Sequence, residues 1–99
     1  RQKQAMTVHT IKTHSQYFQA NRDGIKPFEL RKNDRDYQVG DYLYSREYDP
    51  EMRDFTGRWQ FWKIIYTLTD FLPVGYVAMT IQAITNDEEY NRVFNIVFR

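Results

Sequence analysis

The sequence contains no cysteine, and only four glycines and three prolines occur among its 99 residues. Without cysteine, disulfide bonds, thiolate catalysis and cysteine-based zinc sites are excluded. No apolar run approaches the roughly 20 residues that a membrane-spanning helix needs, and residues 1–5 lack the apolar stretch of a signal peptide. These absences favour a cytoplasmic protein with no membrane partner.

Positive and negative charges are nearly balanced. Lys and Arg number 14 and Asp and Glu number 13, so the net charge selects no class of partner. Residues 1–63 hold 12 of the basic and 9 of the acidic side chains, which leaves 2 and 4 for residues 64–99. The mildly positive first part suits an anionic ligand. The length predicts a single domain over residues 1–99 with one core.

Periodicity predicts an α+β fold, a small β-barrel of five to six strands with one main α-helix inserted after the first strand. The helix is expected to begin at Thr13, with Gln16 completing a capping box, and to end at Gly24. Residues 49–57 resemble a long hairpin loop, and residues 86–91 a turn or short helix. Strands are expected at residues 6–11, 27–32, 42–48, 58–69, 76–84 and, as a closing strand, 93–98.

The end regions of the chain are expected to lie apart from this core. Residues 1–5 are expected to be flexible. Residues 86–99 are expected to form a C-terminal extension that contains the closing strand.

Residues 24–31 form the most informative segment. Gly24 can end a helix in the left-handed conformation, and Pro27 starts an extended segment because it fixes φ and offers no ladder donor. The chain therefore changes direction here. Lys26 lies at the turn, where its flexible ammonium group can reach neighbouring charges.

Alternation along the strand that follows places charged and apolar side chains on opposite faces. Phe28 and Leu30 are expected to face the core, while Glu29 and Arg31 are expected to face a cleft or solvent.

Three interpretations of this charged cluster remain open from the residue types. Glu29 and Arg31 could form an exposed salt bridge, worth less than about 1 kcal/mol. Lys26 and Arg31 could contact a phosphate while Glu29 accepts from the donor edge of a base. Lys26 could also be a nucleophile or general base if burial and nearby cations lowered its pKa.

Aromatic residues make up 17% of the chain and alternate with cations between residues 35 and 63. Rings beside cations suit stacking with single-stranded nucleic acid. The alternative is that a small barrel needs large side chains in its core, and we expect most of these rings to be core. Tyr48 and Trp59 are expected to be exposed and to stack a base. Arg58, Lys32 and Arg35 are expected to add phosphate contacts.

The sequence contains no glycine-rich phosphate loop and no nucleophile elbow. His9 and His14 are five residues apart and straddle a strand end and a helix start, which makes a poor metal pair. No metal or cofactor is expected.

The pattern Gly-x-Lys-x-x-Glu-x-Arg over residues 24–31 resembles the G-x-K-x-x-E-x-R signature of the ASCH domain family, a branch of the PUA-like superfamily. Its continuation, Lys-Asn-Asp-Arg-Asp-Tyr-Gln-Val-Gly-Asp over residues 32–41, is similar to a branch of small, uncharacterised bacterial and phage proteins. Shorter pieces at residues 46–48, 56–58 and 75–77 and His9 also resemble that branch. The resemblance covers roughly residues 8–82.

This resemblance implies a PUA-like barrel with a cleft between barrel and helix, lined by the signature residues, and a role in binding RNA or another nucleic acid. Some ASCH relatives are amidohydrolases that remove the acetyl group from N4-acetylcytidine with the lysine that matches Lys26. The sequence departs from those enzymes at Glu29, where they carry threonine, and it has no clear equivalent of their later catalytic glutamate.

We therefore expect a domain that binds RNA or a nucleotide-like ligand through a charged cleft. The alternatives are an amidohydrolase for a modified nucleoside, with Lys26 as the catalytic residue, and a protein-interaction module. The expected ligand-binding residues are Lys26, Glu29, Arg31, Lys32, Arg35, Tyr48, Arg58 and Trp59.

Overall fold

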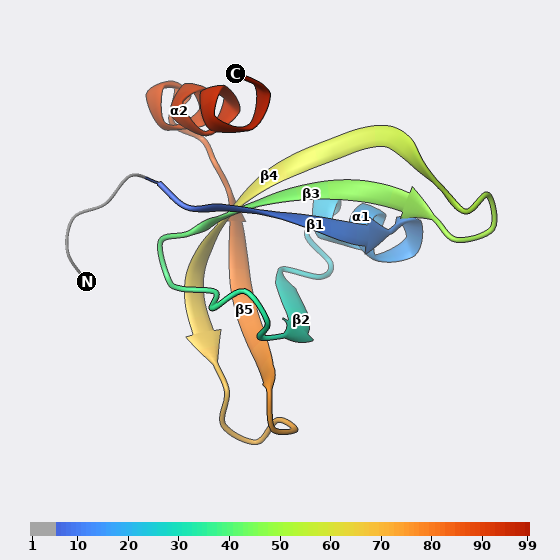
Figure 1. Ribbon diagram of the computed structural model, residues 1–99, viewed down its shortest axis with the longest axis vertical. Coiled ribbons are helices and arrows are strands. Elements are labelled where there is room, and N and C mark those ends of the chain that lie inside the picture. Colours follow the sequence, from blue (N-terminus) through green and yellow to red (C-terminus); the bar gives the residue numbers. More distant parts are fainter. Residues whose placement is uncertain (1–5) are drawn as a thin grey trace.

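The computed structural model describes residues 6–99, and the expectation for residues 1–5 lies outside this range. Five strands and two helices follow one another along this described part of the chain (Figure 1). They are β1 (Val8–His14), α1 (Ser15–Arg22), β2 (Phe28–Lys32), β3 (Tyr42–Asp49), β4 (Asp54–Leu68), β5 (Tyr76–Ala83) and α2 (Asp87–Phe98). The expected α+β class and the helix after the first strand are confirmed. None of the helices in this range is long and apolar enough to cross a membrane.

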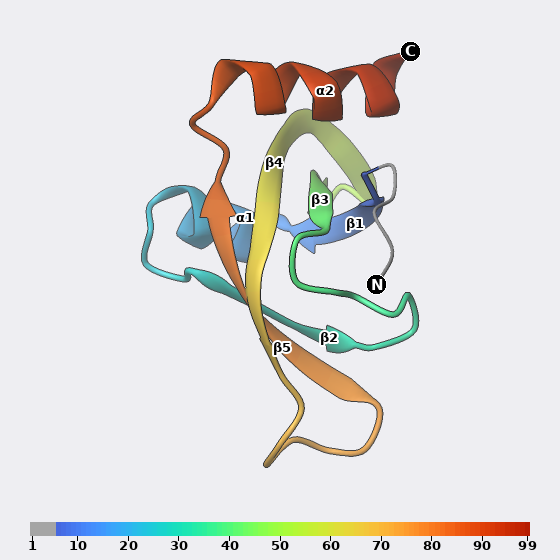
Figure 2. The ribbon, with the colours of Figure 1, turned by 90° about the vertical axis from the view of Figure 1, so that its left-hand side faces the viewer.

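The five strands form one curled sheet in the order β1-β3-β4-β5-β2. Only β1 and β3 run parallel. The 15-residue strand β4 pairs with β3 through its first part and with β5 through its second part, so the sheet bends along it (Figure 2). The sheet is a half-barrel rather than the closed barrel expected, because β1 and β2 remain its two edges.

Two arginine side chains span the opening between those edges. Nη2 of Arg31, on β2, donates to the carbonyl oxygen of Lys12 on β1 at 2.8 Å. Nη1 of Arg35, just beyond β2, donates to the carbonyl oxygen of Thr10 at 2.6 Å. The guanidinium groups thus donate hydrogen bonds to edge carbonyl oxygens that could otherwise pair with a sixth strand.

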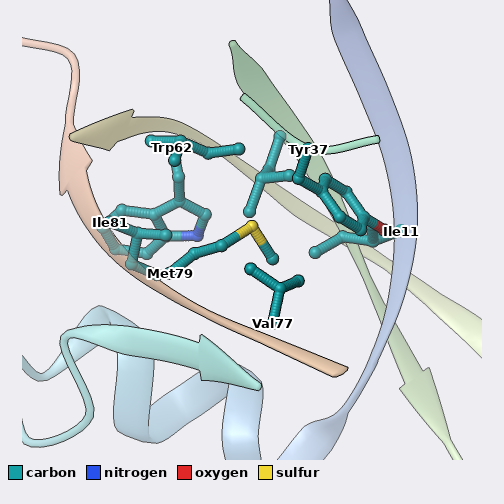
Figure 3. Close-up of a cluster of buried hydrophobic side chains, with 8 residues drawn as sticks. Ile11, Tyr37, Trp62, Val77, Met79 and Ile81 are labelled. Atoms are coloured by element: carbon teal, nitrogen blue, oxygen red, sulfur yellow. The ribbon is translucent and has the colours of Figure 1, made fainter. Parts of the chain in front are cut away.

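The inner face of the curled sheet holds the main core. Figure 3 shows side chains from β1, β4, β5 and the β2–β3 loop that meet in this cluster. Tyr37, from the loop, is buried there, and its ring packs edge-on against His9 with centroids 4.7 Å apart. Nε2 of His9 lies 2.9 Å from Oδ2 of Asp41. The cluster consists of Ile11, Tyr37, Leu43, Trp62, Ile64, Val77, Met79 and Ile81.

A second core lies under α2, which crosses the sheet at the bend of β4 (Figure 2). The closing strand expected at residues 93–98 is wrong, because these residues continue α2. Asn86 caps the helix by accepting from the backbone N–H of Glu89, and Val93 is fully buried against Tyr42 and Phe61. The Glu89 carboxylate also accepts from the Tyr42 hydroxyl and, at 2.9 Å, from Nζ of Lys63.

Two boundaries near the start of the chain differ from expectation. Strand β1 continues to His14 instead of ending at residue 11, so Thr13 is a buried strand residue and not a helix cap. Its hydroxyl pairs with that of Ser45 on β3 at 2.7 Å. Helix α1 begins after His14 with no side-chain cap, and the expected capping box is therefore wrong.

The β3–β4 hairpin is fastened to α1 by Arg58. Its guanidinium group donates to Oε1 of the buried Glu47 at 2.8 Å and to Oε1 of Gln19 on α1 at 3.0 Å. The long loop expected at residues 49–57 is reduced to residues 50–53, because pairing of β3 with β4 resumes at Asp54. Hydrogen bonds from Arg58 hold the pKa of Glu47 at about 2, below its ordinary value of 4.5.

Replacing Val93 by Ala should lower the free energy of unfolding by about 1–3 kcal/mol, because a fully buried side chain loses two methyl groups. Ile96→Ala, on the exposed side of α2, is the matched control and should lower the free energy of unfolding by less than half as much. Urea denaturation of both variants measures the difference. Equal losses would contradict the observed packing, in which Val93 is buried and Ile96 is about half exposed.

Stability should also depend on Glu47 in acid. The folded-state pKa of about 2 lies below the ordinary 4.5, so the contribution is complete above pH 4.5 and disappears as the pH falls towards 2. Denaturation midpoints measured between pH 6 and pH 2 should therefore fall less steeply for Glu47→Gln than for the unmodified protein. Parallel pH curves for the two proteins would show that this carboxylate does not contribute to acid sensitivity.

Candidate ligand-binding groove

The turn between α1 and β2 positions Lys26. Gly24 adopts φ +75°, as a helix-ending glycine does, and the expected chain reversal is confirmed. The carbonyl oxygen of Ala20 accepts from the backbone N–H groups of Ile25 and Lys26 at 3.1 and 3.0 Å. The buried Asn21 donates to the carbonyl oxygen of Lys26 at 2.7 Å. These hydrogen bonds hold the α1–β2 connection against the C-terminal end of α1.

Strand β2 exposes the apolar side chains that were expected to face the core. Glu29 is only 3% exposed, whereas Phe28 and Leu30 are 45% and 52% exposed. The alternation itself is confirmed, but the assignment of the apolar face to the core is wrong. The sheet curls so that the inner face of this edge strand meets β1 and α1, and there the charged side chains pair with one another instead of facing open solvent.

The buried carboxylate of Glu29 lies between two cations. Nζ of Lys26 donates to its Oε2 at 3.3 Å, and also to the carbonyl oxygen of Phe28 at 2.9 Å. Nη2 of Arg31 lies 3.7 Å from Oε1, which is close enough for an ion pair but too far for a hydrogen bond. Oε1 therefore makes no hydrogen bond within residues 6–99 and keeps its capacity to accept one.

These three side chains line one pocket of about 380 Å³, named the Glu29 pocket. Nζ of Lys26 also lies 4.8 Å from the ring centre of Phe28 and 5.6 Å from that of Tyr17, both partly exposed. The pocket thus combines an acceptor, cations and aromatic walls. Its lining consists of Lys12, Thr13, His14, Tyr17, Lys26, Phe28, Glu29, Leu30 and Arg31.

A second pocket of about 390 Å³, named the Arg35 pocket, adjoins the first and shares Lys12, Leu30 and Arg31 with it. Burial raises the pKa of Tyr37, which lines this pocket and remains a neutral phenol. The two pockets form a groove along the opening between β1 and β2. The lining of the Arg35 pocket consists of Ile11, Lys12, Leu30, Arg31, Lys32, Asp34, Arg35, Tyr37 and Tyr76.

Five of the eight expected ligand-binding residues lie in this groove. Lys26, Glu29 and Arg31 line the Glu29 pocket, and Lys32 and Arg35 line the Arg35 pocket together with Arg31.

The other three residues lie elsewhere. Tyr48 is adjacent to the groove, because its ring stacks on His14 at 5.9 Å and Nζ of Lys12 lies 4.4 Å from its centre. Trp59 packs against Phe98 of α2, in the second core. Arg58, as described above, joins the β3–β4 hairpin to α1. The structure does not bring Trp59 or Arg58 to the pocket that holds Lys26.

Six residues that line the Glu29 pocket were not predicted as site residues: Lys12, Thr13, His14, Tyr17, Phe28 and Leu30. Placing the end of the first strand at residue 11 concealed the first three, and assigning the apolar face of the second strand to the core concealed the last two. A strand prediction extended to residue 14 would have shown that Lys12 and His14 alternate with Ile11 and Thr13, which are buried.

The described part of the chain shows no evident set of metal ligands. Residues 6–99 contain no group of three or more His, Asp or Glu side chains that could hold a metal ion. The groove can instead offer hydrogen bonds, positive charge and stacking surfaces.

Comparisons with known proteins define the family. Residues 8–81 match the model of a family described as Domain of unknown function (DUF3850). This stretch includes β1 to β4, most of β5 and the residues that line both pockets. The chain is also 41% identical over 51 residues to the "Uncharacterized 12.9 kDa protein in GpA 3'region" of Escherichia phage P2. That alignment covers 52% of this chain and 45% of the phage protein, so the chain matches less than half of this relative's length. The chain belongs to the DUF3850 family.

Proposed function

We propose that this protein binds RNA or a nucleotide-like ligand in the Glu29 pocket. The observation that carries the proposal is the convergence of Lys26, Glu29 and Arg31 on one open pocket. The Glu29 carboxylate lies there between the two cations, and its Oε1 makes no hydrogen bond within residues 6–99. An exposed salt bridge between Glu29 and Arg31 on a flat surface would instead have supported a purely structural role for these residues. A buried carboxylate at a pocket wall supports a site.

The chemistry of the pocket fits a planar heterocycle that carries N–H groups. Oε1 of Glu29 can accept from an exocyclic amine or ring N–H, as carboxylates accept from cytosine N4. Tyr17 and Phe28 are each nearly half exposed at the pocket and offer ring faces for stacking, a contact worth about 1–3 kcal/mol per base. The carboxylate would orient the base, and the rings would supply much of the affinity.

The proposal includes the finer fold assignment, a PUA-like domain of the ASCH type. Its support is the Gly-x-Lys-x-x-Glu-x-Arg signature, whose three charged residues share the pocket. A curled sheet with a helix after the first strand agrees with that assignment.

Amide hydrolysis of a modified nucleoside is the enzymatic alternative. Lys26 lines the pocket, as that reaction would require, but its ammonium group donates to Glu29 and to the carbonyl oxygen of Phe28. These contacts suit Lys26 to orienting the carboxylate rather than to attacking an acyl group. Incubation with N4-acetylcytidine should release no cytidine, and release that disappears in Lys26→Ala would establish the hydrolase instead.

Binding should be tested by titrating short labelled single-stranded RNA and DNA at about 50 and 200 mM salt, where a cationic groove requires weaker binding at the higher concentration. Glu29→Gln should weaken binding by about tenfold or more, because a charge-assisted hydrogen bond is lost. No binding by the unmodified protein at low salt would refute the proposal.

Glu51→Gln is the matched control, because Glu51 is an exposed carboxylate in the β3–β4 turn. It should bind like the unmodified protein. Thermal unfolding of Glu29→Gln must accompany the titration, since that substitution changes a buried ion-pair network. Equal affinities of the two variants would show that the Glu29 carboxylate takes no part in recognition.

Protein interaction is a second candidate, favoured by the tip of the β4–β5 hairpin, which projects from the sheet (Figure 2). Phe71 and Val74 at this tip are fully exposed. Phe71 also adopts φ +67°, a conformation that costs a phenylalanine about 1–2 kcal/mol. An exposed aromatic ring in a strained conformation is unexplained by folding, so the tip is a candidate contact surface away from the groove.

Replacing Phe71 by Asn should raise the free energy of unfolding by up to about 1 kcal/mol, because asparagine tolerates the left-handed conformation better. Thermal or urea denaturation measures this gain. The same variant should leave ligand binding in the groove unchanged. A loss of stability would show that the ring makes contacts which its exposure does not reveal.

A further inference from the structure

We infer that the Arg35 pocket is a phosphate subsite, so that the ligand of the groove is a nucleotide with its base in the Glu29 pocket and a phosphate beside Arg35 and Lys32. This inference rests on the proposed function, because the Glu29 pocket must hold the base. It adds the second pocket as a separate site and names the chemical class of the group that occupies it.

The two pockets are placed for one ligand that spans both. They share Lys12, Leu30 and Arg31, so the two pockets are neighbours, and a molecule in either one contacts residues that also line the other. Their volumes of about 380 and 390 Å³ together fall within the range of about 300–1,000 Å³ that is typical of small-molecule sites. Both follow the opening between the edge strands.

The charge of the Arg35 pocket selects an anion. Four cations line it, namely Lys12, Arg31, Lys32 and Arg35, against the single carboxylate of Asp34. The Glu29 pocket is lined by three such cations, Lys12, Lys26 and Arg31, and by the buried carboxylate of Glu29, which pairs with the last two. The Arg35 pocket therefore has the larger excess of positive charge.

Donors remain available in the Arg35 pocket. The ammonium group of Lys32 makes no hydrogen bond or ion pair within residues 6–99, and the Arg35 side chain uses only Nη1, for the carbonyl oxygen of Thr10. Nε of Arg31 is buried and has no hydrogen-bond partner in the same range. A guanidinium group offers five N–H donors, so the bonds to β1 leave capacity for a phosphate oxygen.

The arginines are also held in position before a ligand arrives. Their bonds to the carbonyl oxygens of Thr10 and Lys12 restrict rotamers that a free arginine would have to order on binding. Binding therefore requires less ordering of these side chains than it would of unattached ones. Lys32, which is exposed and unbonded, can move to meet the anion.

The experiment compares four probes with the full chain by calorimetry: a nucleoside, its 5′-monophosphate, inorganic phosphate and a short single-stranded RNA. The monophosphate should bind about tenfold or more tightly than the nucleoside, as one charge-assisted contact implies. A preference for the RNA over the monophosphate would identify the phosphate as that of a strand; similar affinities would identify a free nucleotide.

The variant Lys32→Gln removes one cation of the pocket without removing an observed bond. It should weaken the monophosphate several-fold and reduce its salt dependence, while leaving the nucleoside unchanged. Arg53→Gln is the matched control, because Arg53 is exposed in the β3–β4 turn, which Figure 1 shows at the far end of the sheet from the β2–β3 loop. It should bind both probes like the unmodified protein.

Failure of the inference and failure of the proposed function give different results. If the nucleoside and the monophosphate bind equally and Lys32→Gln changes neither, the base site stands and the phosphate subsite is refuted. If neither the nucleoside nor the monophosphate nor the RNA binds, the proposed function fails and the subsite fails with it. If inorganic phosphate competes with the monophosphate in Arg53→Gln but not in Lys32→Gln, the subsite is supported independently.

Discussion

Two arginine side chains from one edge of the sheet hold the other edge in place, and the groove depends on them. A five-stranded sheet that curls this strongly brings β1 and β2 near each other but leaves their backbones unpaired. Direct pairing would close the barrel and remove the groove, whereas an unrestrained gap would leave edge carbonyls to solvent or to another chain. Arg31 and Arg35 reach across to the carbonyl oxygens of Lys12 and Thr10, so the edges are linked while a side-chain-sized space remains. The same contacts that stabilise the half-barrel therefore define the width of the candidate site.

Arg31 has a second role, because it also faces the carboxylate of Glu29. A buried carboxylate is costly unless cations and donors accompany it, and Lys26 and Arg31 supply them from the turn and from the same strand. Lys26 is in turn positioned by the end of α1 through Ala20 and Asn21. The signature spacing thus has a physical reason. A glycine is needed to end the helix, the lysine must lie at the turn, and the glutamate and arginine must share the inner face of an edge strand.

The sequence predicted the parts of this arrangement that depend on local chemistry. The helix end at Gly24 and the alternation of β2 follow from backbone preferences and spacing, whereas the cleft lined by Lys26, Glu29 and Arg31 was implied only by the resemblance of this segment to a family signature. Which face of β2 is buried does not follow from spacing, because that depends on how the whole sheet curls around it. The second helix was predicted only as a turn or short helix at residues 86–91, because residues 93–98 are rich in β-branched and aromatic side chains. Tyr90, Val93, Phe94 and Val97 nevertheless follow helical spacing behind an asparagine cap, and that signal could have identified it.

The position of α2 also explains why sequence reasoning placed Trp59 in the site. A row of aromatic residues beside cations is equally compatible with a stacking platform and with a core, and only the covering element decides between them. Here Trp59, Tyr44 and Phe61 pack against Phe98 of α2, while the Glu89 carboxylate ties the start of that helix to Tyr42 and Lys63. The helix thereby removes one aromatic face of the sheet from solvent and leaves the rings at the β1–β2 opening, those of Tyr17 and Phe28, as the exposed aromatic surface of the groove. The candidate groove and the core under α2 are thus formed by different parts of the same curled sheet.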